Sequence, residues 1–385
     1  MRLLFEVVDS EIKEAKKNMR LAVGMDVHSK NSTAYAVYAG MDEIPTRYEK
    51  FVEEFNREFC EFPSTSDGIG RMVVFLRDNQ YEILIENSTK SHEVYWILTN
   101  MGCKVTVAFA GDLYRITKSV KKTDHNDSVE LAGYMRRRMN GENEFAECYM
   151  PSPEWMMRRE MCRAHLSDGI HLADLKRRIR AHLLLHGLKL DREYSDVTSP
   201  LARESMRKLK DPYLAVLCSD AKATIERRNM TAKTIKAMFY NDRNFELISS
   251  IPGFGIVSSA YVSALVVDVS RFRSREQFTA YFGVVPRMRA SADSDPNCST
   301  THRGDGDMRS LLMMCTQVHI QHSEDSVVTQ LFRRLKAAGK AHKEALTAAS
   351  RKMLVVIFSI LRSGIRYTDD QGLLELARKT QEDAE

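Results

Sequence analysis

The sequence has little that would point to a secreted or membrane protein. Its cysteines are odd in number and contain no CxxC pair, which argues against a disulfide framework or a cysteine zinc site and for a reducing compartment. Glu6 and Asp9 interrupt the N-terminal segment where a signal peptide needs unbroken apolar residues. The longest apolar run, residues 353–361, falls short of the roughly 20 residues that span a bilayer. We therefore expect a soluble, cytoplasmic protein with no membrane partner.

The composition is that of a folded globular protein. The chain has 385 residues, of which 43% are hydrophobic and 28% charged, and this length predicts two domains with a connector. The net charge of +5 permits a polyanionic partner without requiring one, because the distribution of charge matters more than its sum. Internal repeats and low-complexity tracts are lacking.

The N-terminal half has the pattern of an α/β domain. Short apolar runs predict strands, and apolar residues at helical spacing predict helices between them. The order is three strands, helix, strand, helix, strand and helix, over residues 21–26, 33–38, 47–52, 68–79, 82–86, 93–101, 104–109 and 127–139. An antiparallel start followed by alternating units predicts a mixed sheet covered by helices.

Beyond residue 150 the sequence predicts helices and almost no strand. Apolar residues recur at helical intervals amid basic ones, as in long amphipathic, coiled-coil-like helices that pair between subunits. The predicted organisation is a helical extension at 1–20, a catalytic α/β domain at 21–150, a connector and dimerisation region at 151–241, a mostly helical domain at 242–367, and a polar tail at 368–385.

Four carboxylates stand where the chemistry of phosphoryl transfer would need them. Asp26 ends the first predicted strand and Glu86 the fourth, and these strands are neighbours in a sheet of the RNase H type. Asp124 and Asp127 are three apart at a helix start, which places both on one face. Phosphoryl transfer on DNA uses two magnesium ions about 4 Å apart, and magnesium takes oxygen ligands. The four acids together predict such a two-metal site.

Each acid also has a purely structural interpretation. An aspartate after a strand is usually a turn former, and Glu86 could simply be solvated. Asp124 and Asp127 could cap a helix N-terminus and stabilise its dipole. Taken singly these interpretations are favoured, whereas the four acids in the order strand, strand and helix favour a catalytic site.

Several motifs in the right order resemble a known family. The N-terminal half contains GMDVHSK, IENSTKSHEVYWILTNMGCKV and KSVKKTDHNDSVELAGYMRRR, and the C-terminal half contains IPGFGIVSSAYVSALV, FTAYFGVVPRMRAS and HRGDGDMRSLL. These motifs resemble the DEDD transposases of the insertion-sequence family numbered one hundred and ten, which are similar to the pilin-gene invertases. The resemblance covers most of the chain. It implies a RuvC/RNase H-like catalytic domain followed by a serine-bearing transposase domain.

The resemblance assigns the catalytic residues. Asp26, Glu86, Asp124 and Asp127 match the family's magnesium-binding acids, and Ser291 is the closest match to its nucleophilic serine. That serine follows a Gly-x-x-Pro motif, here residues 283–286, and is understood to form a covalent phosphoserine with DNA. The family's serine is usually followed by glycines, but this chain has Ala292 and Asp293, and Ser294 and Ser299 lie in the same loop. A hydroxyl needs a metal or a base to become nucleophilic, which carboxylates of the N-terminal domain would supply.

Glycines and basic residues predict the contacts to nucleic acid. Gly253 and Gly255 stand between predicted helices as in a helix-hairpin-helix, whose free amides bind phosphate, although a plain tight connection has the same pattern. The other predicted contacts are basic residues beside the acids and beside the serine: Arg115, Lys118, Lys121, Lys122, His302, Arg303 and Arg309.

The prediction is a magnesium-dependent DNA transposase or site-specific recombinase. Because members of the resembled family include recombinases guided by a structured noncoding RNA, such an RNA is a predicted partner beside DNA, and a homodimer or homotetramer the predicted assembly. One alternative is a structure-specific, Holliday-junction endonuclease that uses the same acids with metal-activated water. Another is an inactive relic that only holds nucleic acid.

Overall fold

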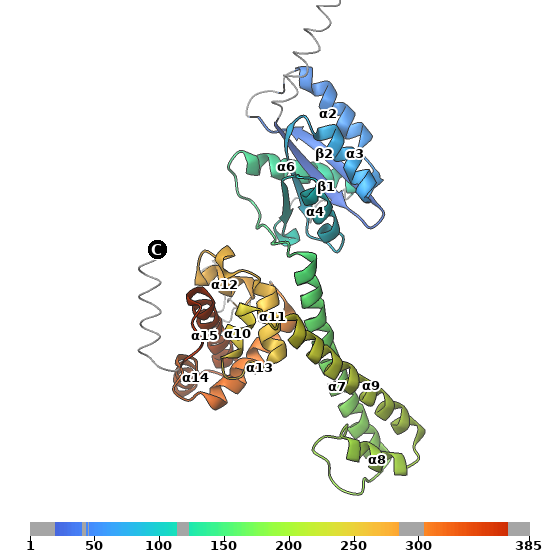
Figure 1. Cartoon of the computed structure of the whole chain (residues 1–385), viewed down its shortest axis with the longest axis vertical. Coiled ribbons are helices and arrows are strands. Elements are labelled where there is room, and N and C mark those ends of the chain that lie inside the picture. Colours follow the sequence, from blue (N-terminus) through green and yellow to red (C-terminus); the bar gives the residue numbers. More distant parts are fainter. Residues whose placement is uncertain (1–19, 41–43, 45, 114–122, 285–303, 369–385) are drawn as a thin grey trace, which may run out of the picture. The chain divides into compact units, whose positions relative to one another are not determined.

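The structure is a computed structural model that describes residues 20–40, 44, 46–113, 123–284 and 304–368 (Figure 1). Most of the predicted N-terminal extension and of the predicted polar tail lie outside these ranges. The chain divides into two compact units, Met1–Met150 and Pro151–Glu385.

The N-terminal unit is built on a five-stranded mixed sheet. Its strands are β1 (Arg20–Val27), β2 (Asn31–Tyr38), β3 (Phe62–Pro63), β4 (Gln80–Glu86) and β5 (Val105–Ala108), in the spatial order β3-β2-β1-β4-β5. β2 is antiparallel to β1 and β3, whereas β1, β4 and β5 are parallel. The prediction of a mixed sheet is confirmed.

Helices cover both faces of this sheet, and alternation along the strands decides which side chains meet which helix. One core contains Leu21, Val23 and Met25 of β1 with residues of α2 (Thr46–Glu58), α3 (Ser66–Leu76) and α4 (Ser91–Asn100). The other core contains Ala22 of β1, Leu84 of β4 and residues of α6 (Asp124–Met139). Because successive side chains of a strand point to opposite faces, even-numbered residues of β1 face α6.

The predicted strand at 47–52 is wrong, because this segment forms the start of α2. Tyr48, Phe55 and Phe59 are buried in one core, and Phe51 and Val52 pack against it. Spacings of three, four and seven residues place these side chains on one helical stripe. The third strand of the sheet is instead the two-residue β3, after α2.

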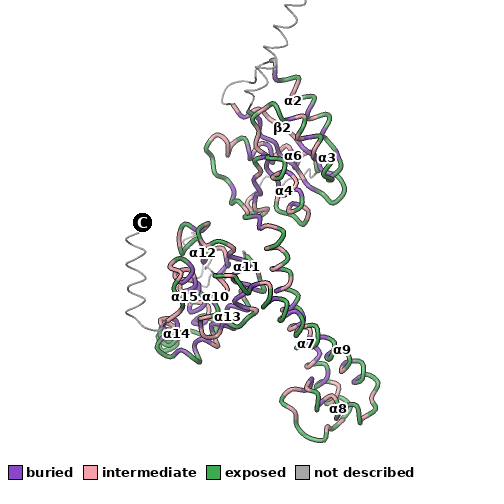
Figure 2. Tube along the Cα trace, viewed as in Figure 1, coloured by how far each residue is buried: buried purple, intermediate pink, exposed green. Residues whose placement is uncertain are grey.

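The C-terminal unit is helical throughout its described residues, as the sequence predicts. Its elements are α7 (Pro153–Leu185), α8 (Pro200–Lys208), α9 (Pro212–Met238), α10 (Arg243–Ser249), α11 (Ile256–Val266), η2 (Val269–Arg271), α12 (Arg275–Tyr281), α13 (Gly306–His322), α14 (Val327–Ala337) and α15 (His342–Ser363). Figure 2 shows buried residues concentrated among α10–α15 and many exposed ones along α7 and α9.

The two long helices α7 and α9 pack against each other within one chain. Arg227 of α9 donates to the carboxylate of Asp168 of α7 from two nitrogens, from Nη2 to Oδ1 at 2.6 Å and from Nε to Oδ2 at 3.0 Å, in the bidentate geometry that suits arginine. The far end of this hairpin has a small core of its own, which includes Leu175, Ile179 and Leu217.

The near end of the hairpin belongs to the main core of the C-terminal unit. Cys162 of α7 and Ile235 and Phe239 at the end of α9 are buried in the same cluster as residues of α10–α15. The regions 151–241 and 242–367, which the sequence treats separately, therefore share one core.

A strained turn ends α11. Val267 has φ 58° and ψ −68°, and the amide of Asp268 donates to the carbonyl of Val266 at 2.7 Å. These values define the rare γ-turn with positive φ, which is costly for a β-branched residue. Two arginine side chains hydrogen-bond to backbone carbonyls beside this turn. Buried Arg159 donates to the carbonyl of Ala264, and Arg271 donates to the carbonyl of Val266.

Among the described residues, no helix is both long enough and apolar enough to cross a membrane.

Candidate metal and nucleic-acid site

The ends of β1 and β4 bring Asp26 and Glu86 to one edge of the sheet. The strands are parallel, and Met25 pairs with Ile85 at the end of their register. Asp26 and Glu86 follow these two residues. Both have even numbers, so alternation along the strands assigns them to the face that α6 covers.

The start of α6 lies on that same face and supplies Asp124 and Asp127. Thr123 is the N-cap, because its side chain accepts a hydrogen bond from the amide of Asn126 at 3.2 Å. The alternative in which Asp124 caps this helix is therefore wrong. Asp124 is exposed as the first helical residue, and Asp127, one turn later, is buried.

A glycine allows the helix to approach the strand this closely. A Cβ at Gly24 of β1 would lie 2.1 Å from the nitrogen of Ala132 and 2.2 Å from the carbonyl oxygen of Ser128, both in the backbone of α6. Atoms cannot approach so closely, so only glycine fits here. Gly24 stands two residues before Asp26 on the same face.

Asp26, His28 and Asp124 form a cluster of potential metal ligands. His28 Nε2 lies 3.0 Å from Asp26 Oδ2 and 3.4 Å from Asp124 Oδ1, and one ligand atom from each residue lies within 4.8 Å of the others. Thr33, which pairs with Asp26 across β1 and β2, donates from its hydroxyl to the backbone carbonyl of Asp124 at 3.1 Å. The antiparallel strand thereby ties the start of α6 to the end of β1.

The electrostatics of this cluster favour a bound cation. The Asp26 side chain is 13% exposed, whereas those of His28 and Asp124 are 55% and 65% exposed. Burial raises the pKa of Asp26 above its ordinary value, contact with His28 opposes this rise, and the charge of Asp124 adds to it. A half-buried carboxylate beside a second carboxylate is stabilised by a cation, and oxygen ligands suit divalent metal ions. The residues present fit such an ion.

Glu86 and Asp127 lie outside this cluster, although their elements place them near it. Glu86 comes from the neighbouring strand and Asp127 from the next turn of α6. Their role as ligands stays a prediction.

His28 is the residue that the sequence prediction missed. It follows β1 within the polar turn to β2, where a histidine is ordinarily solvated. The available signal was its spacing of two residues from Asp26, which favours the same side of an extended chain. Ser64 fixes the backbone there, because its hydroxyl donates to the carbonyl of His28 at 2.8 Å.

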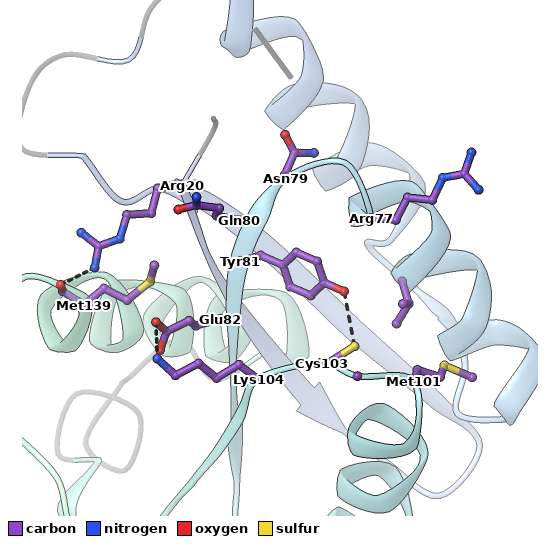
Figure 3. A pocket seen from close by; sticks show the side chains of 12 residues that line it. Arg20, Arg77, Asn79, Gln80, Tyr81, Glu82, Met101, Cys103, Lys104 and Met139 are labelled. Atoms are coloured by element: carbon purple, nitrogen blue, oxygen red, sulfur yellow. Dashed lines mark hydrogen bonds and ion pairs between the residues drawn. The ribbon is translucent and has the colours of Figure 1, made fainter. Parts of the chain in front are cut away.

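A cavity of about 500 Å³ opens at the start of β4, at the end of the strand away from Glu86 (Figure 3). Tyr81 hydrogen-bonds with Cys103 in this cavity, and Lys104 Nζ lies 2.7 Å from Glu82 Oε1. Gln80, which lines the cavity, is the first residue of β4, and Glu86 is the last. The cavity therefore lies at the opposite end of the strand from the acids.

The predicted nucleophile and most predicted basic contacts lie outside the described residues. They are Ser291, Arg115, Lys118, Lys121, Lys122, His302 and Arg303. The described chain resumes at Gly304, directly before α13, where Asp305 is the N-cap. Tyr261 donates to Asp305 Oδ2 at 2.6 Å and Arg163 donates to the same oxygen at 2.8 Å. These hydrogen bonds fix Asp305 at the start of α13.

Gly253 and Gly255 lie between α10 and α11, as the hairpin pattern predicts. Gly253 has φ 94°, and a Cβ there would lie 2.6 Å from the carbonyl oxygen of Cys315 of α13, so close packing alone requires glycine. The amide of Gly255 donates to Ser258 Oγ at 2.8 Å, contrary to the expectation of a free amide. Arg309 donates to the carbonyl of Gly304 at 3.0 Å. Phosphate binding by these residues stays a prediction.

Comparison with known proteins identifies relatives along both units. Residues 245–330 match the sequence family described as the IS116/IS110/IS902 transposases. A putative transposase of Sinorhizobium fredii, y4qE, is 20% identical over 372 residues, which cover 90% of each chain.

Two further relatives match over shorter regions. An uncharacterized 42 kDa protein of insertion element IS900 from Mycobacterium paratuberculosis is 27% identical over 53% of this chain and 46% of its own length. The pilin gene-inverting protein of Moraxella lacunata is 26% identical over 30% of this chain and 36% of its own. The alignment thus spans less than half of each of these two relatives. Together with the matched domain and the relative that aligns over 90% of each chain, they show that this chain is similar to the IS116/IS110/IS902 transposases and to the pilin gene-inverting protein.

Proposed function

We propose that this protein is a DNA transposase or site-specific recombinase whose N-terminal unit uses Asp26, Glu86, Asp124 and Asp127 to hold magnesium ions. The observation that carries the proposal is the convergence of Asp26 and Asp124, from β1 and α6, on one imidazole. These two acids are 98 positions apart in the sequence, and the relatives named transposase and pilin gene-inverting protein favour chemistry on DNA.

The fold supports this assignment. An antiparallel start, β3-β2-β1, followed by parallel β4 and β5 is the strand arrangement expected of an RNase H/RuvC-like domain. In the C-terminal unit, two helices joined by glycines support a helix-hairpin-helix.

The chemistry divides between the acids and a serine. Bound divalent cations would stabilise charge that develops on the phosphate oxygens. Asp26 and Asp124 would hold the cations, and Gly24 and Thr33 keep the end of β1 and the start of α6, which carry these two acids, close together. We propose that Ser291 Oγ attacks a DNA phosphorus, forming a phosphoserine while the bond to the leaving strand breaks and its oxygen takes a proton. A DNA hydroxyl then attacks the phosphoserine, which restores the serine and rejoins the strands.

DNA is the proposed substrate, a structured noncoding RNA the proposed guide, and a homodimer or homotetramer the proposed assembly. To test the first two, the full chain is co-expressed with the DNA that flanks its gene, and the copurifying nucleic acid is sequenced. Recovery of one discrete transcript supports guidance, whereas recovery of random cellular RNA contradicts it.

The reaction itself is tested on labelled DNA that carries the ends of the element. With magnesium, we expect a covalent protein–DNA adduct that is lost in Asp26→Asn, Asp124→Asn and Ser291→Ala. Ser310→Ala, an exposed serine of α13, is the matched control and should retain the adduct.

Two other outcomes are informative. An adduct that persists in Ser291→Ala but disappears in Ser294→Ala or Ser299→Ala would assign the nucleophile to that neighbour. Hydrolysed ends that still form in Ser291→Ala would favour the junction endonuclease, in which metal-activated water attacks.

A further inference from the structure

His28 has the geometry of a metal ligand. Its Nε2 faces carboxylate oxygens of two separate elements, at 3.0 Å from Asp26 and 3.4 Å from Asp124. Adjacent ligands of an octahedral ion with bonds of about 2.1 Å lie about 3.0 Å apart. The two distances from the His28 nitrogen, the shorter of which is a hydrogen bond in this structure, are close to that value.

We propose that His28 is a third protein ligand of the cation that Asp26 and Asp124 hold, and that its nitrogen makes this site prefer Mn²⁺ over Mg²⁺. This inference rests on the proposed metal site. It adds a residue and a metal preference that four carboxylates alone would not supply, because Mg²⁺ takes oxygen ligands almost exclusively, whereas an imidazole nitrogen is a better ligand for a transition-metal ion such as Mn²⁺.

The surroundings of His28 support a ligand rather than a mere partner of the acids. The hydroxyl of Ser64 donates to the backbone carbonyl of His28, so the backbone of His28 is fixed while its side chain can rotate. The ring is 55% exposed, and rotation of its side chain adjusts the nitrogen without disturbing a core. If His28 served only to neutralise Asp26, contact with one carboxylate would suffice, whereas its nitrogen faces two.

The test measures Mn²⁺ binding by the full chain directly, without an activity assay. Free Mn²⁺ is followed by electron paramagnetic resonance during titration, and bound Mn²⁺ is examined by pulsed measurement of coupling to ¹⁴N. We expect the wild-type protein to show a directly bound imidazole nitrogen.

His28→Asn should lose that coupling and bind Mn²⁺ about tenfold more weakly, as expected for loss of one ligating contact. Its Mg²⁺ affinity, measured by competition, should change less, so the preference for Mn²⁺ falls. His125→Asn is the matched control. His125 is also exposed and follows Asp124 directly, but its ring packs edge-on against Tyr35 and is not in the cluster. This variant should behave as the wild type.

The outcomes separate this inference from the proposed function. Mn²⁺ binding that depends on Asp26 and Asp124 but shows no ¹⁴N coupling, or keeps the coupling in His28→Asn, would overturn the role of His28 and leave the metal site intact. Mn²⁺ binding that is absent, or unaffected in Asp26→Asn and Asp124→Asn, would overturn both.

Discussion

At the scale of single residues, Gly24 determines how close α6 lies to the acid at the end of β1. In Gly24→Ala, the added methyl group would overlap the backbone of α6 and push the helix away from the strand. We expect a loss of about 1–3 kcal/mol in unfolding free energy, typical of overpacking, together with weaker Mn²⁺ binding because Asp124 moves from Asp26.

Denaturant unfolding and metal titration check this prediction. Gly133→Ala is the control, since Gly133 lies in α6, the helix that Gly24 contacts, and its Cβ would meet only the end of the Arg137 side chain, at 3.4 Å. An unchanged stability and metal affinity in Gly24→Ala would contradict the tight contact.

Asp305 gives a prediction with a defined pH dependence. Burial alone would raise its pKa, but hydrogen bonds from Tyr261 and Arg163 outweigh burial and lower the pKa below its ordinary value. A carboxylate with a depressed folded pKa stabilises the fold above its unfolded pKa of about 3.9, and this contribution disappears as the pH falls through the folded value.

We therefore expect Asp305→Asn to lose about 1.5–3 kcal/mol at pH 7. The difference from wild type should narrow below about pH 4, as measured by urea unfolding over a pH series. Asp307→Asn, an exposed acid at the same helix end, should show a much smaller loss. A difference that stays constant down to pH 2 would contradict the role of the Asp305 carboxylate.

The sequence predicted Asp26 and Asp124, which the structure brings together, but not His28, which lies between them, and the reason is physical. Asp26 follows an apolar strand, and Asp124 and Asp127 start a helix, so local patterns indicate both. His28 gains its role only when α6 docks on the sheet and brings Asp124 to its ring. Such tertiary proximity leaves no periodic signal along the chain.

At the scale of elements, the turn after α11 stores backbone strain. Val267→Gly removes the cost of positive φ, and Val267→Ala keeps it. We expect the glycine variant to be more stable than the alanine variant by about 1–2 kcal/mol, since neither retains the valine side chain. Thermal unfolding of the two purified variants checks the order, and a more stable alanine variant would contradict it.

Helices and strands were predicted correctly where the apolar residues of a segment fitted only one type of element. β4 was predicted because residues 82–86 form a short apolar run, and the helix α7 because its apolar residues recur at helical intervals. Residues 47–52 were mistaken for a strand because an amphipathic helix presents paired apolar residues such as Phe51 and Val52, which resemble a short strand in isolation. The amide of Gly255 was expected to be free because the pairing of Ser258 with it depends on the local turn.

At the scale of the whole molecule, the two units have separate cores and should unfold separately. The sheet has its cores on its two faces, and the C-terminal unit has its own large cluster. We expect calorimetry to resolve two transitions. Gly24→Ala should lower the melting temperature of one transition, and Asp305→Asn that of the other. A single transition that both variants shift equally would contradict this independence.

The path of the chain through the C-terminal unit was not predictable from periodicity. Amphipathic spacing identified the long helices and even their basic faces, and it predicted pairing between subunits. It could not show that α7 and α9 pack within one chain, because the spacing of apolar residues along a helix does not specify which element packs against them.

The hairpin of α7 and α9 leaves the main core after Leu166 and returns to it at Ile235. In architectural terms, the stretch between these residues is an insertion. Its first and last turns pack side by side, and its far end is stabilised by a small core that includes leucines of both helices. Because the far end of the hairpin has its own core, changes in the length or sequence of this insertion need not alter the main core of the C-terminal unit. During synthesis, the ribosome must complete the whole arm before the first turns of α7 find the residues that bury them.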